Sequence, residues 1–433
     1  MLSRRHFVSL AAAAAGLPVT RVSAQRGRGG SPASAPPPAS IGRLASMRDR
    51  ARPITAGERR TRLDKARRLM ADNRLDAVML TGGTSLVYFT GVRWGVSERL
   101  FAVVLPARGD AFCVCPAFEN DRAHEQLASG PLANTEVRTW QEDESPFARV
   151  AQGLTDRGIV AGRLGVEDTA PFVFADGLAA AAPALRVVSA TPVTAGCRMI
   201  KDAHEIELMR LASLATLTAY EAAYRALAPG MTQTDVGNLI GTAYARLGFA
   251  GFASVQVGAY TALPHGSIAP QTIREGTIIM LDDGCVVEGY QSDITRTFVL
   301  GKPTAKMKTV FDIVRRAQTA GLNAARPGVT LESVDAAARK VIVDAGYGPL
   351  FKYFTHRLGH GLGMDGHEWP YLVKNNMFGW ERSLVLQPGM TFSDEPGIYI
   401  PGEFGVRLED DMHITDRGAE LFTPQSPSIE QPF

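Results

Sequence analysis

The chain has 433 residues, of which 45% are hydrophobic and 21% are charged, and its formal net charge is +2. This length accommodates two globular domains of ordinary size and excludes a small module held together by disulfides. The near balance of charge gives no electrostatic argument for binding to nucleic acid or to an anionic membrane.

The first 24 residues resemble a twin-arginine export signal. Arg4 and Arg5 precede a short apolar run, and the small residues Val-Ser-Ala stand directly before Gln25. The apolar run is too short to span a membrane. We therefore expect residues 1–24 to be removed and the mature protein to be periplasmic or secreted, with a basic N-terminal arm as the alternative. Removal takes away three arginines, including Arg21, and changes the formal charge to −1.

Residues 25–54 differ in composition from the rest of the chain. They are rich in Gly, Pro, Ser and Ala. A segment of this composition buries too little apolar surface to fold, so it is predicted to be a disordered linker.

The four cysteines do not predict a disulfide framework. Cys113 and Cys115 stand two apart in an expected strand, and a bond between such close neighbours would close a strained ring. Cys197 and Cys285 have no evident partner in the sequence. All four thiols are therefore expected to be free.

Residues 55–195 show helix and strand patterns in alternation. Apolar residues first recur at helical spacing, with Leu63, Ala66 and Met70 on one side. A buried strand follows, and then a hairpin that turns at residues 108–110. The alternation predicts a compact α/β domain.

Residues 196–425 begin with helical patterns and end with strand patterns. A long amphipathic helix ends at Pro229 and Gly230, and two further helices run through residues 305–346. Strand-like segments dominate the remainder of this region. The second domain, and with it the whole chain, is therefore predicted to be α+β.

Two aspartates are placed to face each other across a hairpin. Asp282 and Asp293 flank a segment that can form a turn. Residues whose numbers have the same sum lie opposite each other in a hairpin, so a turn centred near Val287 and Glu288 pairs the two carboxylates. Like charges in this position are destabilising unless a cation lies between them.

Two glutamates and a histidine extend this candidate metal site. Glu395 and Glu409 lie in two further strand-like segments. Carboxylates combined with one imidazole suit Mn²⁺, Co²⁺ or Zn²⁺ in a two-metal cluster. A solvated acid on a strand or turn is the alternative for each residue taken alone.

The stretch HRLGHGLGMDGHE contains three histidines, His356, His360 and His367. The first two are four residues apart, as in the helical His-x3-His motif of many zinc hydrolases. Arg357, however, takes the place of the glutamate that this motif requires, and the glycines argue against a helix. The helical zinc motif is therefore excluded.

Five motifs together resemble the metal-binding pattern of the pita-bread metallopeptidases, the M24 family that includes aminopeptidase P, prolidase and methionine aminopeptidase. In chain order the motifs are LDDG, SDITRTF, GHGLGMDGHE, DEPGIYI and VRLEDD. The resemblance covers roughly residues 55–425. It implies an N-terminal α/β domain of the creatinase/prolidase type over residues 55–195, followed by a pita-bread catalytic domain over residues 196–425.

The resemblance also implies which residues bind metal. Asp282 would bind one ion, and Asp293 and Glu409 would bridge two ions. His360 and Glu395 would complete the site of the second ion, so that each chain holds two divalent metal ions. Mn²⁺ is the expected metal, with Co²⁺ and Zn²⁺ as alternatives.

Further roles are implied for residues around the metal ions. His356 and His367 would flank the substrate, and His265 would stabilise the tetrahedral intermediate. Arg407 would pair with a carboxylate of the site. Glu395 would also accept the proton of the attacking water. A structural role is the alternative for the three histidines outside the ligand set.

The activity that the resemblance implies is hydrolysis of Xaa-Pro peptide bonds. Methionine aminopeptidases lack an N-terminal domain, whereas aminopeptidase P and prolidase carry one that narrows the pocket and takes part in oligomer contacts. We therefore expect an exported metallo-exopeptidase that acts on proline-containing peptides as a homodimer or higher homo-oligomer. The alternatives are a relative that cleaves a small non-peptide substrate and a non-catalytic module that binds peptides.

The choice between a dipeptidase and an aminopeptidase stays open. Prolidases resemble one another in carrying an arginine shortly before an LQPGM-like turn, where it grips the free carboxylate of a dipeptide. Here Arg382 is one candidate, but Glu381 lies as close to that position. This departure speaks against a strict dipeptidase.

Overall fold

A mixed sheet of six short strands organises the first half of the chain. In the computed structural model, which describes residues 36–374 and 384–433, the strand order is β4-β3-β2-β1-β5-β6. Neighbours β1, β2 and β3 are antiparallel, and the outer pairs are parallel. The strands are β1 (Ala77–Thr81), β2 (Ala102–Pro106), β3 (Phe112–Pro116), β4 (Glu136–Trp140), β5 (Gly162–Val166) and β6 (Leu185–Ser189).

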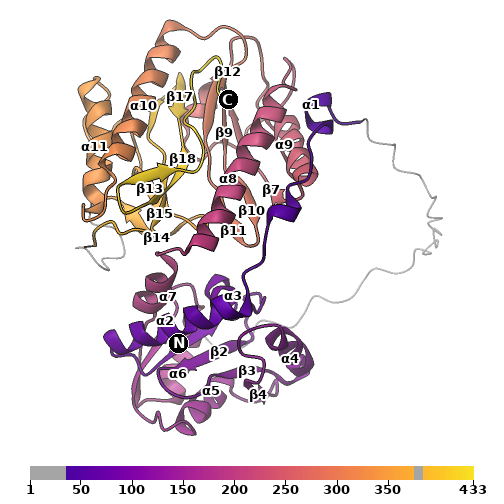
Figure 1. The fold of residues 1–433 in the computed structure, drawn as a ribbon, viewed down its shortest axis with the longest axis vertical. Coiled ribbons are helices and arrows are strands. Elements are labelled where there is room, and N and C mark those ends of the chain that lie inside the picture. Colours follow the sequence, from indigo (N-terminus) through magenta and orange to yellow (C-terminus); the bar gives the residue numbers. More distant parts are fainter. Residues whose placement is uncertain (1–35, 375–383) are drawn as a thin grey trace, which may run out of the picture. The chain divides into compact units, whose positions relative to one another are not determined.

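Helices cover both faces of this sheet because its central strands are apolar on both sides (Figure 1). Val78 and Leu80 face one core, and Ala77 and Met79 face the other. The first core is closed by α2 (Ala56–Asp72), α3 (Thr84–Thr90), α4 (Asn120–Ala128) and α7 (Thr191–Arg198). The second is closed by α5 (Pro146–Thr155) and α6 (Phe172–Ala181), and a short 3₁₀ helix, η2 (Ala117–Glu119), follows β3. The predicted α/β domain and its hairpin between β2 and β3 are confirmed.

Residues 36–54 are ordered, so the prediction of a disordered linker is wrong for this part. Helix α1 (Ala39–Gly42) and the 3₁₀ helix η1 (Arg48–Arg50) lie here. Ile41 is fully buried in a core shared with two later helices, and the Met47 N–H donates to the Leu247 carbonyl at 2.8 Å. Ile41, Leu44, Met47, Ala51 and Ile54 recur three or four positions apart, a pattern that the average composition of the segment conceals. Residues 1–35, with the predicted signal and the rest of the linker, lie outside the described chain.

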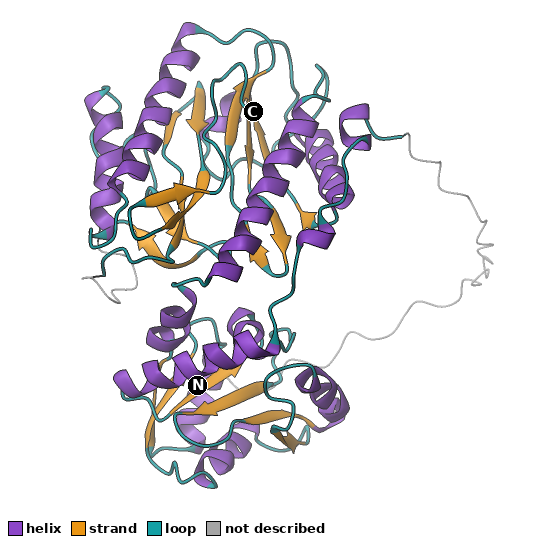
Figure 2. Ribbon diagram, viewed as in Figure 1, coloured by secondary structure: helices purple, strands orange, loops and turns teal. Residues whose placement is uncertain are grey.

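The second half of the chain places strands between two pairs of helices (Figures 1 and 2). Helices α8 (Ala203–Tyr224) and α9 (Gln233–Leu247) form one core with the first strands. Helices α10 (Ala305–Ala324) and α11 (Leu331–Asp344) form a second core with the last strands. This arrangement confirms the predicted pita-bread domain within an α+β chain.

The strands of this half form four small sheets, with orders β12-β9-β8, β11-β10-β7, β14-β13-β15-β18-β19 and β16-β17. The early strands are β7 (Ala250–Gly251), β8 (Ser254–Val257), β9 (Ile278–Asp282), β10 (Cys285–Val287), β11 (Tyr290–Gln291) and β12 (Arg296–Val299), with the 3₁₀ helix η3 (Gly258–Ala262) after β8. The late strands are β13 (Gly359–Gly361), β14 (Glu368–Leu372), β15 (Thr391–Asp394), β16 (Gly397–Ile400), β17 (Phe404–Arg407), β18 (Asp410–Ile414) and β19 (Ala419–Leu421).

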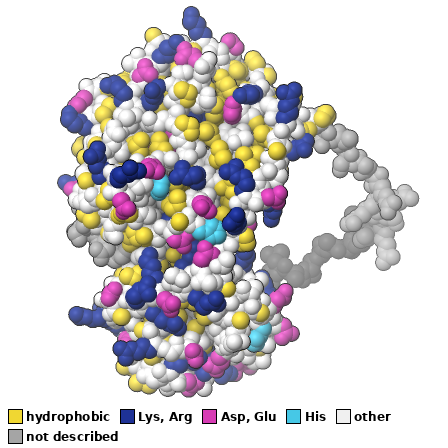
Figure 3. Space-filling view, viewed as in Figure 1, with side chains coloured by type: hydrophobic (Ala, Val, Ile, Leu, Met, Phe, Trp, Pro, Cys, Tyr) yellow, Lys and Arg dark blue, Asp and Glu magenta, His cyan; other side chains and the backbone are white. Residues whose placement is uncertain are grey.

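The surface and the cysteines agree with the composition. The face in Figure 3 intersperses Lys and Arg with Asp and Glu, as the small net charge leads one to expect. All four cysteines are buried and free, as predicted. Within residues 36–374 and 384–433, every helix is too short or too polar to cross a bilayer.

Candidate metal centre and active site

The first two candidate ligands are placed by a hairpin whose turn lies one residue later than predicted. Val287 pairs with Tyr290, so the turn is centred on Glu288 and Gly289, whose φ angles are 50° and 93°. Two positive φ angles are typical of a type I′ turn, which matches the twist of the strands. The register of β9 and β12 therefore places Thr295, not Asp293, opposite Asp282. Residues 282 and 293 lie diagonally rather than face to face.

All five predicted ligands nevertheless meet at one place. Ligand atoms of Asp282, Asp293 and Glu409 lie within 4.8 Å of one another, and so do those of His360, Glu395 and Glu409. Each residue lies in a strand or within two residues of one: at the end of β9, between β11 and β12, in β13, after β15 and between β17 and β18. Glu409 belongs to both groups, which is the arrangement that a ligand bridging two ions requires.

The carboxylates of this cluster repel one another. Burial, together with the charges of Asp282 and other nearby acids, raises the pKa of Asp293 well above its usual range. Burial and the neighbouring Asp293 and Glu395 do the same to the pKa of Glu409, and burial raises the pKa of Glu395 to about 7. Divalent cations among the carboxylates would relieve this repulsion, and an oxygen-rich donor set with one imidazole fits Mn²⁺, Co²⁺ or Zn²⁺. The residues present therefore fit a divalent-metal centre.

His360 is in the correct protonation state and tautomer for a ligand. Burial lowers its pKa well below the usual value, so the imidazole is neutral. Its Nδ1 lies 3.1 Å from the Gly361 carbonyl and donates to it, which leaves Nε2 with a free lone pair. That atom lies 3.3 Å from Glu395 Oε1 and 3.8 Å from Asp293 Oδ2, facing the carboxylates.

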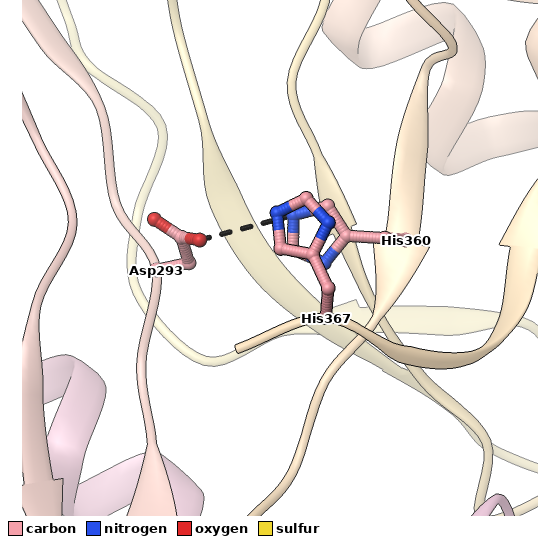
Figure 4. A group of neighbouring side chains, drawn as sticks. All are labelled: Asp293, His360 and His367. Carbon is pink, nitrogen blue, oxygen red and sulfur yellow. Dashed lines mark ion pairs between the residues drawn. The ribbon is translucent and has the colours of Figure 1, made fainter. Parts of the chain in front are cut away.

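His367 lies closer to the ligand cluster than the family resemblance implies. Its ring stacks on that of His360 with centroids 3.7 Å apart, and both rings face Asp293 (Figure 4). The ligand atoms of these three residues also fall within 4.8 Å of one another. The geometry therefore places His367 within reach of either a metal ion or a substrate.

Thr295 and Arg407 connect two of the carboxylates. Thr295 Oγ1 lies 2.6 Å from both Asp282 Oδ1 and Glu409 Oε2, and it accepts a hydrogen bond from Arg407 Nε at 2.9 Å. Arg407 also forms an ion pair with Asp282. Thr295 was not among the site residues predicted from the sequence. Its position two residues after Asp293, on the same face of an extended segment, was the available signal.

A second chain of hydrogen bonds runs from Arg407 to His356. Arg407 Nη1 donates to the Tyr399 hydroxyl at 3.1 Å, and this hydroxyl lies 2.7 Å from His356 Nε2. His356 Nδ1 donates to the Arg357 carbonyl at 2.8 Å, so Nε2 accepts from the tyrosine. Burial and the nearby Arg407 charge lower the pKa of His356 to about 3, which keeps the ring neutral. Tyr399 was missed because the motif GIYI reads as an ordinary buried strand.

One cavity of about 610 Å³ contains this whole constellation. The five candidate ligands, the three other histidines and Arg407 all line it. His265 is exposed on its wall, and Arg407 Nη1 donates to the carbonyl of the preceding Pro264 at 3.0 Å. The same arginine thus contacts the carboxylate cluster, Tyr399 and the loop that carries His265. Glu381 and Arg382, the candidates for gripping a dipeptide carboxylate, lie outside the described residues.

A second cluster of charges, which we call the junction cluster, lies beside the cavity. It consists of Arg198, Lys201, Asp365 and Glu368. Lys201 Nζ lies 2.6 Å from Glu368 Oε1, and Arg198 pairs with both acids. Burial alone would raise the pKa of Glu368, but the two cations lower it below its usual value. The junction cluster holds the first residue of β14, directly after His367.

Comparison with known proteins agrees with this architecture. The model of the metallopeptidase family M24 matches residues 207–416, and the creatinase/prolidase N-terminal domain matches residues 62–200. The chain is 39% identical over 361 residues to a Mycobacterium tuberculosis protein named "Probable dipeptidase PepE", covering 83% of this chain and 92% of the relative. It is 32% identical over 381 residues to the Xaa-Pro dipeptidase of Lactobacillus delbrueckii subsp. lactis, covering 85% and 98%.

Solved structures show the same likeness. The dipeptidase PepE from Mycobacterium ulcerans superposes with a TM-score of 0.80 at 35% identity, covering 88% of this chain and 99% of that one. A prolidase from Thermococcus sibiricus superposes with a TM-score of 0.73 at 30% identity, covering 84% and 96%. The chain therefore belongs to metallopeptidase family M24, in the branch that carries a creatinase/prolidase N-terminal domain.

Proposed function

We propose that the protein is an Xaa-Pro dipeptidase with two divalent metal ions per chain. The observation that carries this proposal is the pair of overlapping ligand groups, which share Glu409 and lie in one cavity with three further histidines. The relatives named as Xaa-Pro dipeptidase and prolidase support the substrate class. The complete donor set speaks against the metal-free and non-catalytic alternatives.

Five residues would hold the ions. Asp282 with Asp293 and Glu409 would hold one, and His360 and Glu395 with the same two bridging carboxylates would hold the other. Divalent ions in such a site lower the pKa of a bound water and polarise a carbonyl group. We propose Mn²⁺ as the metal, because carboxylates outnumber the single imidazole in this set.

Residues around the ligands would carry the proton and orient the peptide. Glu395, whose pKa is raised to about 7 by burial, is suited to accept a proton at neutral pH. His265 and His367 line the cavity and are exposed, so that an imidazole can donate to the developing oxyanion. The neutral His356 is held by Tyr399 and would contact the peptide.

Four histidine variants test the assignment. His360→Ala is expected to lose one of the two ions and most activity. His265→Ala and His367→Ala are expected to keep both ions and to lose turnover on the order of 10²-fold. His124→Ala, in α4 and outside the cavity lining, serves as the matched control. Metal content and kcat/KM on an Xaa-Pro dipeptide are measured for each variant. A His367→Ala protein that loses metal while His360→Ala retains two ions would reverse the assignment.

Export by the twin-arginine route is a second part of the proposal. It rests on Arg4, Arg5 and the Val-Ser-Ala segment of the sequence. Fractionation of cells that express the Arg4→Lys, Arg5→Lys double variant tests it. The variant protein is expected to remain cytoplasmic and active, and undiminished periplasmic recovery would exclude this route.

The assembly state completes the proposal. We propose a homodimer or higher homo-oligomer, by analogy with relatives that carry the same N-terminal domain. Light scattering of the purified protein measures the mass directly, and a monomer at micromolar concentration would contradict it.

A further inference from the structure

Arg357 differs from the buried arginines of this protein. Four arginines are 7% exposed or less in the described residues, and each has a carboxylate partner. The pairs are Arg62–Glu205, Arg296–Asp410, Arg339–Asp335 and Arg407–Asp282. Arg357 is half-buried in the wall of the catalytic cavity, yet none of the described carboxylates lies within 4.0 Å of its guanidinium.

The contacts that Arg357 does make leave most of its hydrogen-bond donors free. Its guanidinium carbon lies 4.1 Å from the centre of the Tyr371 ring, and Nη2 lies 3.4 Å from His367 Nδ1. The ring contact is a cation–π interaction, and the histidine contact is long for a hydrogen bond. A guanidinium has five N–H donors in a fixed fork, so the edge that faces the cavity can still bind a planar anion.

Desolvation makes such an anion favourable. Burial lowers the pKa of Arg357, and Tyr371 and Glu395 offset this only in part, so the cation has lost hydration without a carboxylate at ion-pair distance. A charge in this condition gains free energy when an opposite charge binds. The adjacent cluster would not repel an anion, because two divalent ions would neutralise the four carboxylates that hold them. Lys374 adds a second cation to the cavity wall, and Arg407 is already paired with Asp282.

We propose that Arg357 binds a carboxylate of the peptide substrate and is a specificity-determining residue of this enzyme. The inference rests on the proposed peptidase function and names the substrate group that the cavity selects. Two groups have this chemistry: the free C-terminal carboxylate of an Xaa-Pro dipeptide and the side chain of an acidic first residue. Either one would lie beside His367, which Arg357 contacts, and so within the catalytic cavity.

Paired substrates separate the two sources. Ala-Pro and Ala-Pro-amide differ only in the C-terminal charge, and Asp-Pro and Asn-Pro differ only in the charge of the first side chain. The ratio of kcat/KM within each pair is measured for the wild type, Arg357→Gln, Arg357→Lys and the exposed control Arg108→Gln, all loaded with Mn²⁺. A ratio within one preparation does not depend on the fraction of enzyme that is folded or metal-loaded.

The glutamine variant is expected to lose a preference of about 10- to 100-fold in one of the two pairs, as for a charge-assisted hydrogen bond. The loss should be mainly in KM, and the lysine variant should retain part of the preference. A loss confined to the Ala-Pro pair assigns the C-terminal carboxylate, and a loss confined to the Asp-Pro pair assigns the side chain. Unchanged ratios in both pairs would overturn the inference while leaving the proposed peptidase function intact. A wild type that cleaves none of the four peptides would instead remove the proposed function.

Discussion

The five candidate ligands, which we call the metal-ligand cluster, and the junction cluster both bury carboxylates, but the pKa values of these carboxylates shift in opposite directions. Glu409 is 2% exposed and Glu368 is 7% exposed. The pKa of Glu409 is raised by burial and by neighbouring acids, whereas Arg198 and Lys201 lower the pKa of Glu368. The junction cluster has two cations for its two carboxylates, whereas Arg407 is the one cation paired with the four carboxylates of the metal-ligand cluster in the described residues. The paired charges of the junction cluster contribute to stability, whereas the excess negative charge of the metal-ligand cluster favours the binding of cations.

The largest effect is expected for Glu409→Gln, which changes the carboxylate common to both ligand groups. Activity should fall roughly 10³-fold, because neither ion would keep its full set of charged ligands. The metal-free variant should be at least as stable as the metal-free wild type, since one of several mutually repelling charges is gone. Metal content, kcat/KM and Tm with and without chelator measure these effects. Asp416→Asn, an exposed acid outside both clusters, is the control.

Glu368→Gln should show the reverse pattern. The substitution leaves Lys201 buried without its carboxylate and Arg198 with one partner fewer, so the free energy of unfolding should fall by about 3 kcal/mol. Both metal ions should still bind. Urea unfolding in the presence of chelator measures the stability, and metal analysis of the folded protein measures the ions. If stability were unchanged and metal were lost, the two clusters would not differ in the way described.

Thr295→Val tests how far the ligand cluster depends on neutral groups around it. The valine keeps the shape of the threonine but removes the hydroxyl that contacts Asp282, Glu409 and Arg407. Metal affinity should fall roughly 10- to 100-fold, as for other residues that orient ligands. Thr295→Ser retains the hydroxyl and should retain the affinity. Calorimetric titration of the metal-free proteins with Mn²⁺ compares the two, and equal weakening in both would point to packing instead.

Glu167 represents an intermediate case, with the smallest expected effect. Burial raises its pKa to about 7, and the charge of nearby Arg198 and a hydrogen bond from Ser85 offset only part of this rise. Its folded pKa exceeds the unfolded value, so the folded state binds the extra proton. The stability from Glu167 is therefore full below about pH 4.5 and is lost as the pH rises through 7. Glu167→Gln should remove about 2 kcal/mol of the decline between pH 5 and 7. Parallel stability curves for variant and wild type would contradict this.

The sequence predicted the ligand residues better than their geometry. Asp282, Asp293 and Glu409 stand in recognisable motifs, and the structure brings them together. The predicted register was wrong because a shift of the turn by one residue changes every pairing, and the pairing of Val287 with Tyr290 and the φ angles at Glu288 and Gly289 reveal its position.

Residues that act through three-dimensional neighbours were the hardest to predict. Tyr399 is far in sequence from His356, which it contacts in the structure. Arg357 was identified from the sequence only as the residue that replaces the glutamate of the helical zinc motif. The order of residues 36–54 was also missed, because it depends on α8 and α9, which lie much later in the chain. In each case the missing information was a long-range contact rather than a local pattern.

The packing of residues 36–54 also constrains the order in which the protein can fold. Arg48 and Gly248, which share a hydrogen bond, are 200 positions apart, and the whole N-terminal sheet lies between them in sequence. The catalytic core is therefore discontinuous along the chain, and closing it carries the entropy cost of a long loop. A fragment that begins at the start of α8 would lack Ile41 and expose the apolar surface that this residue covers. The core of the peptidase half thus includes residues from the start of the described chain, although its family signature is confined to residues 207–416.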